Sequence, residues 1–138
     1  MAVVTGATDG LGASIALTLG EQAANVVVAY TNSPSDVEPI IQAIRSQGKG
    51  GAIGVKADVS TIEGGKILIE ETLKTFGKID ILVLNAGRTG SKGLTDLDET
   101  FFDANFAANV KAPLFLAKHV APILPSRTSH ASFSFLEC

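Results

Sequence analysis

A glycine-spaced turn near the start of the chain constrains the fold more than any other stretch. It follows an apolar strand, precedes a helical run and reads Thr5-Gly6-Ala7-Thr8-Asp9-Gly10-Leu11-Gly12. Gly6 can adopt backbone angles closed to residues with a Cβ, Gly10 lets phosphates approach the main chain, and Gly12 lets the helix pack on the strand. Because a helix N-terminus favours anions, the turn predicts a phosphate-binding corner. A turn that serves only strand-to-helix packing is the alternative.

Apolar strands and amphipathic helices alternate after this turn. Strands are predicted at residues 25–29, 52–57 and 80–84, and four helices by apolar residues at helical spacing. Alternation of this kind implies right-handed crossovers and a parallel sheet. We therefore predict an α/β fold with a Rossmann-like doubly wound parallel sheet, truncated after about four strands in the order 3-2-1-4. The apolar residues that mark the helices are Leu11, Ile15 and Leu19; Val37, Ile40, Ile41 and Ile44; Ile62, Ile69, Leu73 and Phe76; and Phe102, Phe106, Val110 and Leu114.

Local signals set the expected helix boundaries. The run from Ser60 to Glu63 has the capping-box pattern and predicts the start of the third helix. Pro113 predicts an irregularity within the fourth, long helix, and Pro122 predicts its end. Residues 126–138 are rich in serine and lack helical periodicity, so we expect an incomplete nucleotide-binding domain at 1–125 and a divergent tail at 126–138. Phe133 and Phe135 alternate with serine, so a short edge strand is an alternative to a frayed tail.

Bulk properties exclude several classes of partner. The 138-residue chain suits one domain, and its net charge of −3 gives no reason to expect nucleic acid or an anionic membrane. A lone cysteine, Cys138, cannot form an internal disulfide, and the N-terminal stretch lacks the features of a signal peptide. No apolar run is long enough to span a membrane. We expect a cytoplasmic protein without a metal site.

Four motifs together resemble the short-chain dehydrogenase/reductase family. The glycine turn has the spacing Thr-Gly-x-x-x-Gly-x-Gly, and the fourth predicted strand ends in an Asn-Ala-Gly element that resembles the family's Asn-Asn-Ala-Gly. Asp58-Val59 resembles the pair that contacts adenine, and Asn109-Val110 resembles the asparagine of the fourth helix that supports the catalytic proton relay. These motifs occur in the family's order from residue 2 to about 124.

The resemblance implies a role for each matching residue. Taken singly, Asp58 could be a helix cap, Asn85 a turn former, and Asn109 a partner of a neighbouring carbonyl. The implied assignments are Thr5, Gly6, Thr8, Gly10, Leu11 and Gly12 at the pyrophosphate; Tyr30, Asn32 and Ser33 at the adenosine ribose and its phosphate; Asp58 and Val59 at the adenine; Asn85, Ala86 and Gly87 at the central cofactor region; and Asn109 in the catalytic set.

The residues after the second strand bear on the choice between NAD and NADP. An acidic residue there would bind the ribose hydroxyls of NAD, whereas basic or hydroxyl residues would accept a 2′-phosphate. The sequence runs from Tyr30 to Ser33 without an acid, and its Tyr-x-Asn-Ser pattern resembles NADP-dependent ketone and polyketide reductases of fungi and bacteria. Asp9 argues the other way, because its charge would repel a phosphate. We expect NADP, with NAD as the alternative.

The catalytic residues of the family are not recognisable in this chain. The family uses a Tyr-x-x-x-Lys pair and an upstream serine, but the single tyrosine, Tyr30, is followed four residues later by Pro34. We therefore expect a catalytically incomplete NADP(H)-binding part of an oxidoreductase, acting on a small carbonyl substrate only if the enzyme is complete. The alternative is a non-catalytic truncated isoform that binds nucleotide or forms a homo-oligomer through the long helix around Asn109. The abrupt change near Ser126 suggests a frameshifted, alternatively spliced or misassigned reading of a longer gene.

Overall fold

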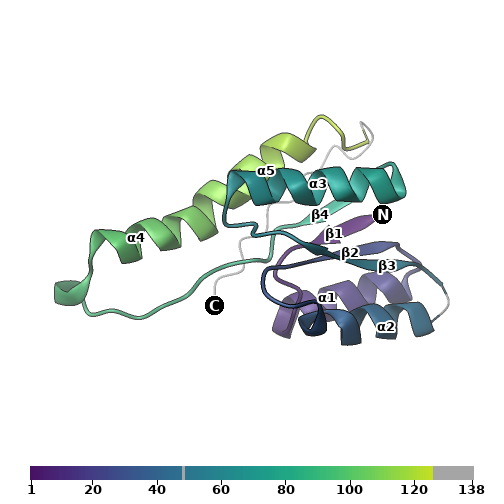
Figure 1. The fold of residues 1–138 in the computed structure, drawn as a ribbon, viewed down its shortest axis with the longest axis horizontal. Coiled ribbons are helices and arrows are strands. Elements are labelled where there is room, and N and C mark those ends of the chain that lie inside the picture. Colours follow the sequence, from purple (N-terminus) through teal and green to yellow (C-terminus); the bar gives the residue numbers. More distant parts are fainter. Residues whose placement is uncertain (48, 126–138) are drawn as a thin grey trace.

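Four parallel strands form the sheet in the order β3-β2-β1-β4, which confirms the predicted topology (Figure 1). In the computed structural model, which describes residues 1–47 and 49–125, the strands are β1 (Ala2–Val4), β2 (Val26–Tyr30), β3 (Ala52–Lys56) and β4 (Ile81–Val83). Val4 pairs with Val28 on one side and with Val83 on the other, so the carboxyl ends of three strands meet at one edge. The predicted edge strand at Phe133 and Phe135 lies outside the described residues.

Helices cover both faces of the sheet (Figure 1). One layer consists of α1 (Gly10–Glu21) and α2 (Glu38–Ser46), with the short 3₁₀ turn η1 (Pro34–Asp36) before α2. The other layer contains α3 (Ile62–Phe76) and α5 (Ala112–Val120). Between β4 and α5 the chain forms the 3₁₀ turn η2 (Leu94–Asp96), the helix α4 (Glu99–Phe106) and the π-helical segment η3 (Ala107–Lys111). The result is the doubly wound α/β arrangement that the sequence predicted.

Alternate residues along the strands supply two separate cores. Val3 and Val27 point to the side of α3 and α5, whereas Val4 and Val28 point to the side of α1 and α2. All four valines are at most 1% exposed. Successive side chains of a strand face opposite sides, so a strand covered on both faces becomes continuously apolar. This explains the run of three valines in β2.

The buried face of α1 differs from the expected one. Leu11 is 51% exposed, whereas the fully buried positions are Gly12, Ala16 and Gly20. A Cβ added at Gly20 would lie 2.7 Å from Cγ2 of Ile44, so α1 approaches its neighbours too closely for larger side chains there. Leu11, one of the apolar residues that predicted this helix, therefore lies at the surface, and the small residues mark the inner face.

The start of α3 lies one residue later than the capping-box pattern suggested. Thr61 is the N-cap and its Oγ1 accepts a hydrogen bond from the Gly64 amide at 3.0 Å. Ser60 instead donates through its hydroxyl to Asp58 Oδ1 at 2.6 Å. Gly64 is buried so tightly that an added Cβ would lie 2.0 Å from the Asp58 carbonyl oxygen. Glycine is unfavourable in the interior of a helix, but close packing requires it at this position.

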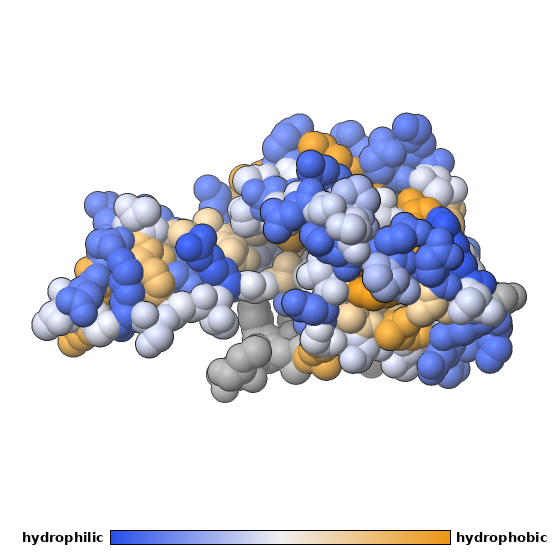
Figure 2. All heavy atoms as spheres, turned by 60° about the horizontal axis from the view of Figure 1, so that its bottom comes forward, coloured by the Kyte–Doolittle hydropathy of each residue, from blue (hydrophilic) through white to orange (hydrophobic). Residues whose placement is uncertain are grey.

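The long helix is interrupted where Pro113 predicted an irregularity. The π-helical η3 separates α4 from α5, and Pro113 occupies the first turn of α5. The helix ends at Val120, two residues before Pro122. Among the described residues, α4 and η3 contribute no buried side chain, and α4 projects away from the sheet (Figures 1 and 2).

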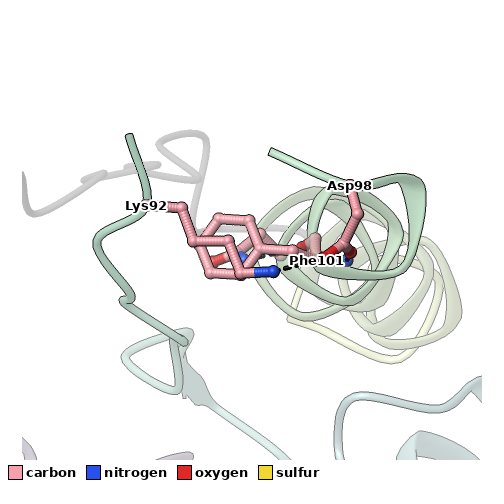
Figure 3. A network of polar contacts seen from close by, with 4 residues as sticks. Lys92, Asp98 and Phe101 are labelled. Atoms are coloured by element: carbon pink, nitrogen blue, oxygen red, sulfur yellow. Dashed lines mark hydrogen bonds and ion pairs between the residues drawn. The ribbon is translucent and has the colours of Figure 1, made fainter. Parts of the chain in front are cut away.

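Polar contacts fix the beginning of α4 (Figure 3). Asp98 caps the helix by accepting a hydrogen bond from the Phe101 amide at 2.7 Å. Lys92 pairs with the Asp98 carboxylate and lies 5.2 Å from the centre of the Phe101 ring. The Lys92 ammonium and then the Phe101 amide lower the pKa of Asp98 below its ordinary value. The loop after β4 is thus tied to the helix that follows it.

Candidate nucleotide-binding site

Thr5 and Asn85 join the ends of β1 and β4. The buried Thr5 hydroxyl donates to the Val83 carbonyl at 3.1 Å and accepts from the amides of Asn85 and Ala86 at 3.1 and 3.0 Å. Asn85 Nδ2 donates in turn to the carbonyls of Thr5 and Gly6 at 3.1 and 2.7 Å. Every bond links residues about eighty positions apart in the chain, so the glycine turn is held by the end of the neighbouring strand.

The three glycines of the turn occupy three different structural environments. Gly6 has a φ of +61°, and a Cβ there would lie 2.6 Å from the Ala86 Cα. Gly12 is packed so closely that a Cβ would lie 2.2 Å from the Gly6 carbonyl oxygen. Gly10 has a φ of +53°, but no atom lies within 4 Å of the position of its Cβ. Gly6 and Gly12 thus serve close packing and backbone shape, whereas Gly10 faces open space.

That open space lies at the N-terminus of α1. The N-cap, Asp9, makes no side-chain cap hydrogen bond, and Asp9, Gly10 and Leu11 are all exposed. The first amides of a helix have no partner within the helix, and an exposed helix N-terminus of this kind attracts anions. The corner therefore fits a dinucleotide pyrophosphate, which would meet main-chain amides over Gly10 without a Cβ in the way.

A cavity of about 450 Å³ lies beside the turn, at the carboxyl ends of β1 and β2. Two residues that the sequence assigned to the cofactor, Thr8 and Asn32, line it. Tyr30 does not line it, because its side chain packs against the core on the side of α1 and α2. The cavity also includes Asp36, which the sequence reasoning missed as a site residue although Ser33 to Asp36 has a capping pattern. Its full lining is Thr8, Asp9, Thr31, Asn32 and Asp36.

The two predicted adenine contacts lie after β3. Asp58 is exposed and accepts hydrogen bonds from the amide and the hydroxyl of Ser60 at 3.0 and 2.6 Å. Val59 is half-buried and lines a small cleft together with Leu84 and Ala86. Asp58 therefore shapes the turn before α3, and Val59 connects this turn to the residues after β4.

Asn109 holds the loop after β4 against the long helix. Its Oδ1 accepts a hydrogen bond from the Arg88 amide and its Nδ2 donates to the Arg88 carbonyl, both at 2.7 Å. A Cβ added at Gly87 would lie 3.1 Å from Asn109 Oδ1. Asn109 lies in η3, so the π-helical segment presents an amide side chain to a loop that follows the central sheet. The Nδ2 hydrogen bond joins Asn109 to a carbonyl 21 residues earlier in the chain.

The parallel sheet and its glycine turn define a Rossmann-like protein. The family model for short chain dehydrogenases matches residues 1–131, and the chain belongs to this family. Two fungal relatives are similar to it: elsinochrome reductase 1 of Elsinoe fawcettii, with 38% identity, and versicolorin reductase 1 of Aspergillus parasiticus, with 39%. The matches cover 86% of this chain but 44% and 45% of the relatives. The chain thus spans about half the length of the curated relatives it matches.

Solved structures agree with this assignment. A metagenomic short-chain oxidoreductase in complex with NADP superposes with a TM-score of 0.83 and 34% identity, over 88% of this chain and 55% of the other. The L-sorbose reductase of Gluconobacter frateurii, complexed with NADPH and L-sorbose, gives 0.84 and 25%, over 91% of this chain and 48% of the other. Both similar structures contain the phosphorylated nicotinamide dinucleotide.

Within residues 1–47 and 49–125, no helix is both long and apolar enough to cross a membrane. No group of three or more His, Cys, Asp or Glu side chains there could hold a metal ion.

Proposed function

We propose that this chain is the NADP(H)-binding part of a short-chain oxidoreductase, with a nucleotide-binding domain at residues 1–125 and a cytoplasmic location. The observation that carries the proposal is the open helix N-terminus over Gly10, held in place by the bonds between Thr5 and Asn85. Such a corner binds a pyrophosphate through main-chain amides. In this family a hydride passes between the cofactor and a carbonyl or alcohol carbon, from the reduced cofactor to a carbonyl or from an alcohol to the oxidised cofactor, and the protein residues place the two beside each other.

Each predicted site residue has a place in this proposal. Thr5 ties the turn to Asn85. Gly6 and Gly12 shape the turn, and Thr8, Gly10 and Leu11 surround the pyrophosphate. Asn32 and Ser33 provide amide and hydroxyl groups to the ribose and its phosphate, with Tyr30 beneath them as packing. The remaining assignments are Asp58 and Val59 near the adenine, Asn85, Ala86 and Gly87 along the central part of the cofactor, and Asn109 as the member of the catalytic set that this chain contains.

The preference for NADP rests on the absence of an acid between Tyr30 and Ser33 and on similar structures that contain NADP or NADPH. A 2′-phosphate needs hydrogen-bond donors, and Thr31 and Asn32 line the cavity beside the turn. NAD would use the same corner, since the pyrophosphate contacts do not depend on the 2′ position.

A titration tests the proposal directly. NADPH is added to the purified chain, and nicotinamide fluorescence and the thermal midpoint are followed. The chain contains no tryptophan, so the nicotinamide signal is read without that background. We expect saturable binding and a raised midpoint, because a ligand that binds only the folded state stabilises it. A folded chain that shows neither response would contradict the proposed function.

We further propose that this chain alone does not reduce a substrate. A general acid must lie within hydrogen-bond reach of the reacting oxygen, and the chain's one tyrosine packs against the core on the side of α1 and α2. Addition of a generic diketone to the NADPH complex should leave NADPH consumption at the level of a buffer control. Consumption above that level would refute the inactive assignment.

One observation favours a second, non-catalytic function. Phe102, Phe106, Val110 and Leu114 form an apolar stripe along α4, η3 and α5, and they are 48%, 51%, 47% and 63% exposed. The rings of Phe102 and Phe106 stack with their centres 4.3 Å apart. Exposed apolar surfaces of this kind mark interaction sites, so the stripe supports a homo-oligomer formed through the long helix.

Sedimentation analysis tests this second function. We expect the wild-type chain to self-associate with increasing concentration and a Phe106→Ser, Leu114→Ser variant to remain a monomer. A matched control, Ile67→Ser, removes another exposed apolar residue on α3 and should leave association unchanged, since Ile67 is 41% exposed and lies outside the stripe. A monomeric wild-type chain would contradict the interaction role.

A further inference from the structure

The cavity beside the glycine turn contains two carboxylates. Asp9 and Asp36 line it, and among its described lining residues there is no basic side chain. Lys56 pairs with Tyr30 in the neighbouring strand but does not contribute to the lining. The remaining lining residues, Thr8, Thr31 and Asn32, are neutral. A ligand group that enters this cavity therefore meets hydrogen-bonding groups together with a negative field.

Asp36 already occupies the main-chain amide of Ser33, the residue whose hydroxyl the proposed function gives to the ribose and its phosphate. The Ser33 amide donates to Asp36 Oδ2 at 3.1 Å. The Ser33 hydroxyl lies 2.7 Å from the Ser35 hydroxyl and accepts from the Ser35 amide at 3.3 Å. A phosphate can thus reach the Ser33 amide only by displacing the Asp36 carboxylate, which is itself an anion.

We propose that Asp36 is a specificity-determining residue whose carboxylate competes with the 2′-phosphate of NADP(H) for the Ser33 amide. Asp9 lines the same cavity, and its carboxylate also repels the 2′-phosphate. A ribose with a free 2′-hydroxyl has no such conflict, because a hydroxyl can donate a hydrogen bond to a carboxylate. Asp36 therefore reduces the preference for NADP(H) that the donors between Thr31 and Ser33 would otherwise give. The inference rests on the proposed function, since it concerns the same site.

The test compares dissociation constants for NADPH and NADH, measured by fluorescence titration on the full chain and on three variants. Asp36→Asn removes the charge and keeps an oxygen that can still accept from the Ser33 amide. Asp9→Asn removes the second charge. Asp103→Asn, an exposed acid on α4, is the matched control with the same change in net charge.

We expect Asp36→Asn to shift the affinity ratio toward NADPH by about threefold to tenfold at low ionic strength, and salt to reduce this shift. Asp9→Asn should act in the same direction with a smaller change. The affinity for NADH should change by a smaller factor than the affinity for NADPH in Asp36→Asn and Asp9→Asn, and Asp103→Asn should leave the ratio unchanged. Adenosine 2′,5′-bisphosphate should displace NADH more effectively from Asp36→Asn than from the wild-type chain.

Thermal unfolding of each variant establishes that it is folded, and Asp36→Ser replaces Asp36→Asn if the amide variant does not fold. An unchanged ratio in a folded variant at position 36, or an equal shift in Asp103→Asn, would overturn the inference while NADPH binding itself upholds the proposed function. A folded wild-type chain that binds neither dinucleotide would overturn the proposed function and, with it, the inference.

Discussion

The region through α3 and the region from β4 onward bury their apolar side chains to very different degrees. In β2 four of the five residues are buried, whereas β4 has an exposed residue followed by two half-buried ones. Ten large apolar residues are exposed in the described chain, and eight of them lie at residue 81 or later. The first region is therefore mostly buried, whereas the second adds Leu116 and Val120 of α5 to the core and presents apolar surface along β4, η2 and the stripe on the long helix.

The nucleotide-binding residues and Asn109, the one named member of the catalytic set, lie in different regions. The glycine turn and the adjoining cavity are built on the well-buried region, whereas Asn109 lies in η3, which has no buried residue. The two regions meet at the bonds between Thr5 and Asn85. We infer that nucleotide binding depends on the first region and its link to Asn85, and that the second region contributes surface for contacts with other chain segments or copies.

The largest expected effect contrasts one residue from each region. Ile44 is fully buried against α1, so Ile44→Ala should lower the free energy of unfolding by about 2 to 4 kcal/mol through lost burial and a cavity. Leu114 is 63% exposed, so Leu114→Ala should change it by less than about 0.5 kcal/mol. Urea unfolding at low protein concentration measures both. Similar losses in the two variants would show that the long helix is covered in solution.

The second effect concerns the link between the regions. Asn85→Asp keeps the shape of the side chain but replaces the Nδ2 donor, so a carboxylate oxygen would face the carbonyls of Thr5 and Gly6. We expect a loss of about 1 to 3 kcal/mol in unfolding free energy, because two partly buried carbonyls lose their donor. NADPH binding should weaken as well. Unchanged stability and binding in this variant would remove Asn85 from the structural account.

Strands were predictable because buried parallel strands are continuously apolar, and their order was predictable because the alternation of strands and helices implies right-handed crossovers in a doubly wound sheet. The run of valines in β2 and the turns between elements predicted the sheet without knowledge of any tertiary contact. The inner face of α1 was not predictable from large apolar residues. Gly12 and Gly20 can be recognised as inner-face residues only when the distance between the packed elements is known. The cap at Thr61 was missed for a similar reason, because Ser60 has a competing partner in Asp58.

The site was predictable where a residue acts through its backbone and less so where it acts through its side chain. Because they are glycines, Gly6 and Gly12 predict a tight turn and a close approach of backbone segments, and the structure shows both. Tyr30 has an apolar ring that can pack against the core, and nothing in its sequence position reveals that it does. Asp36 enters the cavity through the geometry of η1, which depends on how the loop closes after β2.

A third, smaller effect concerns the ion pair that joins the N-terminus to the strand β4. The Met1 ammonium and Lys78 lie 2.8 and 2.9 Å from Asp80 Oδ2, and they lower the pKa of this carboxyl below its ordinary value of 3.8. A carboxyl whose pKa is lowered by folding stabilises the folded state above its unfolded pKa. Asp80→Asn should therefore lower the free energy of unfolding by about 1 kcal/mol at pH 7.

The pH dependence supplies the check on this third effect. The difference in unfolding free energy between the wild-type chain and Asp80→Asn should shrink as the pH falls below 3.8 and through the lower folded pKa. Both chains are then uncharged at this position. Urea midpoints measured from pH 7 to pH 2.5 follow the change. A difference that stays constant over this range would contradict the assignment to the ion pair.

The smallest effect lies at the start of α4. Lys92→Gln removes the ammonium beside Asp98, so the pKa of Asp98 should rise toward its ordinary value while remaining below it, because the Phe101 amide still donates. Carboxyl NMR titration measures this shift. The thermal midpoint at neutral pH should not change, since exposed ion pairs contribute little to stability. A marked fall in the midpoint would show that α4 is more tightly bound to the rest of the protein than its exposure indicates.

The central claim is that the open N-terminus of α1 binds the dinucleotide, and a matched pair of glycine variants tests it most directly. Gly10 and Gly77 have φ values of +53° and +72°, and neither has an atom within 4 Å of its Cβ position. Gly10→Ala and Gly77→Ala should therefore lose similar stability, about 1 kcal/mol each, from the left-handed backbone. We predict that NADPH affinity, measured by titration calorimetry, falls at least about tenfold in Gly10→Ala alone, because its methyl group occupies the approach of the pyrophosphate. Equal affinities in the two folded variants would contradict the account.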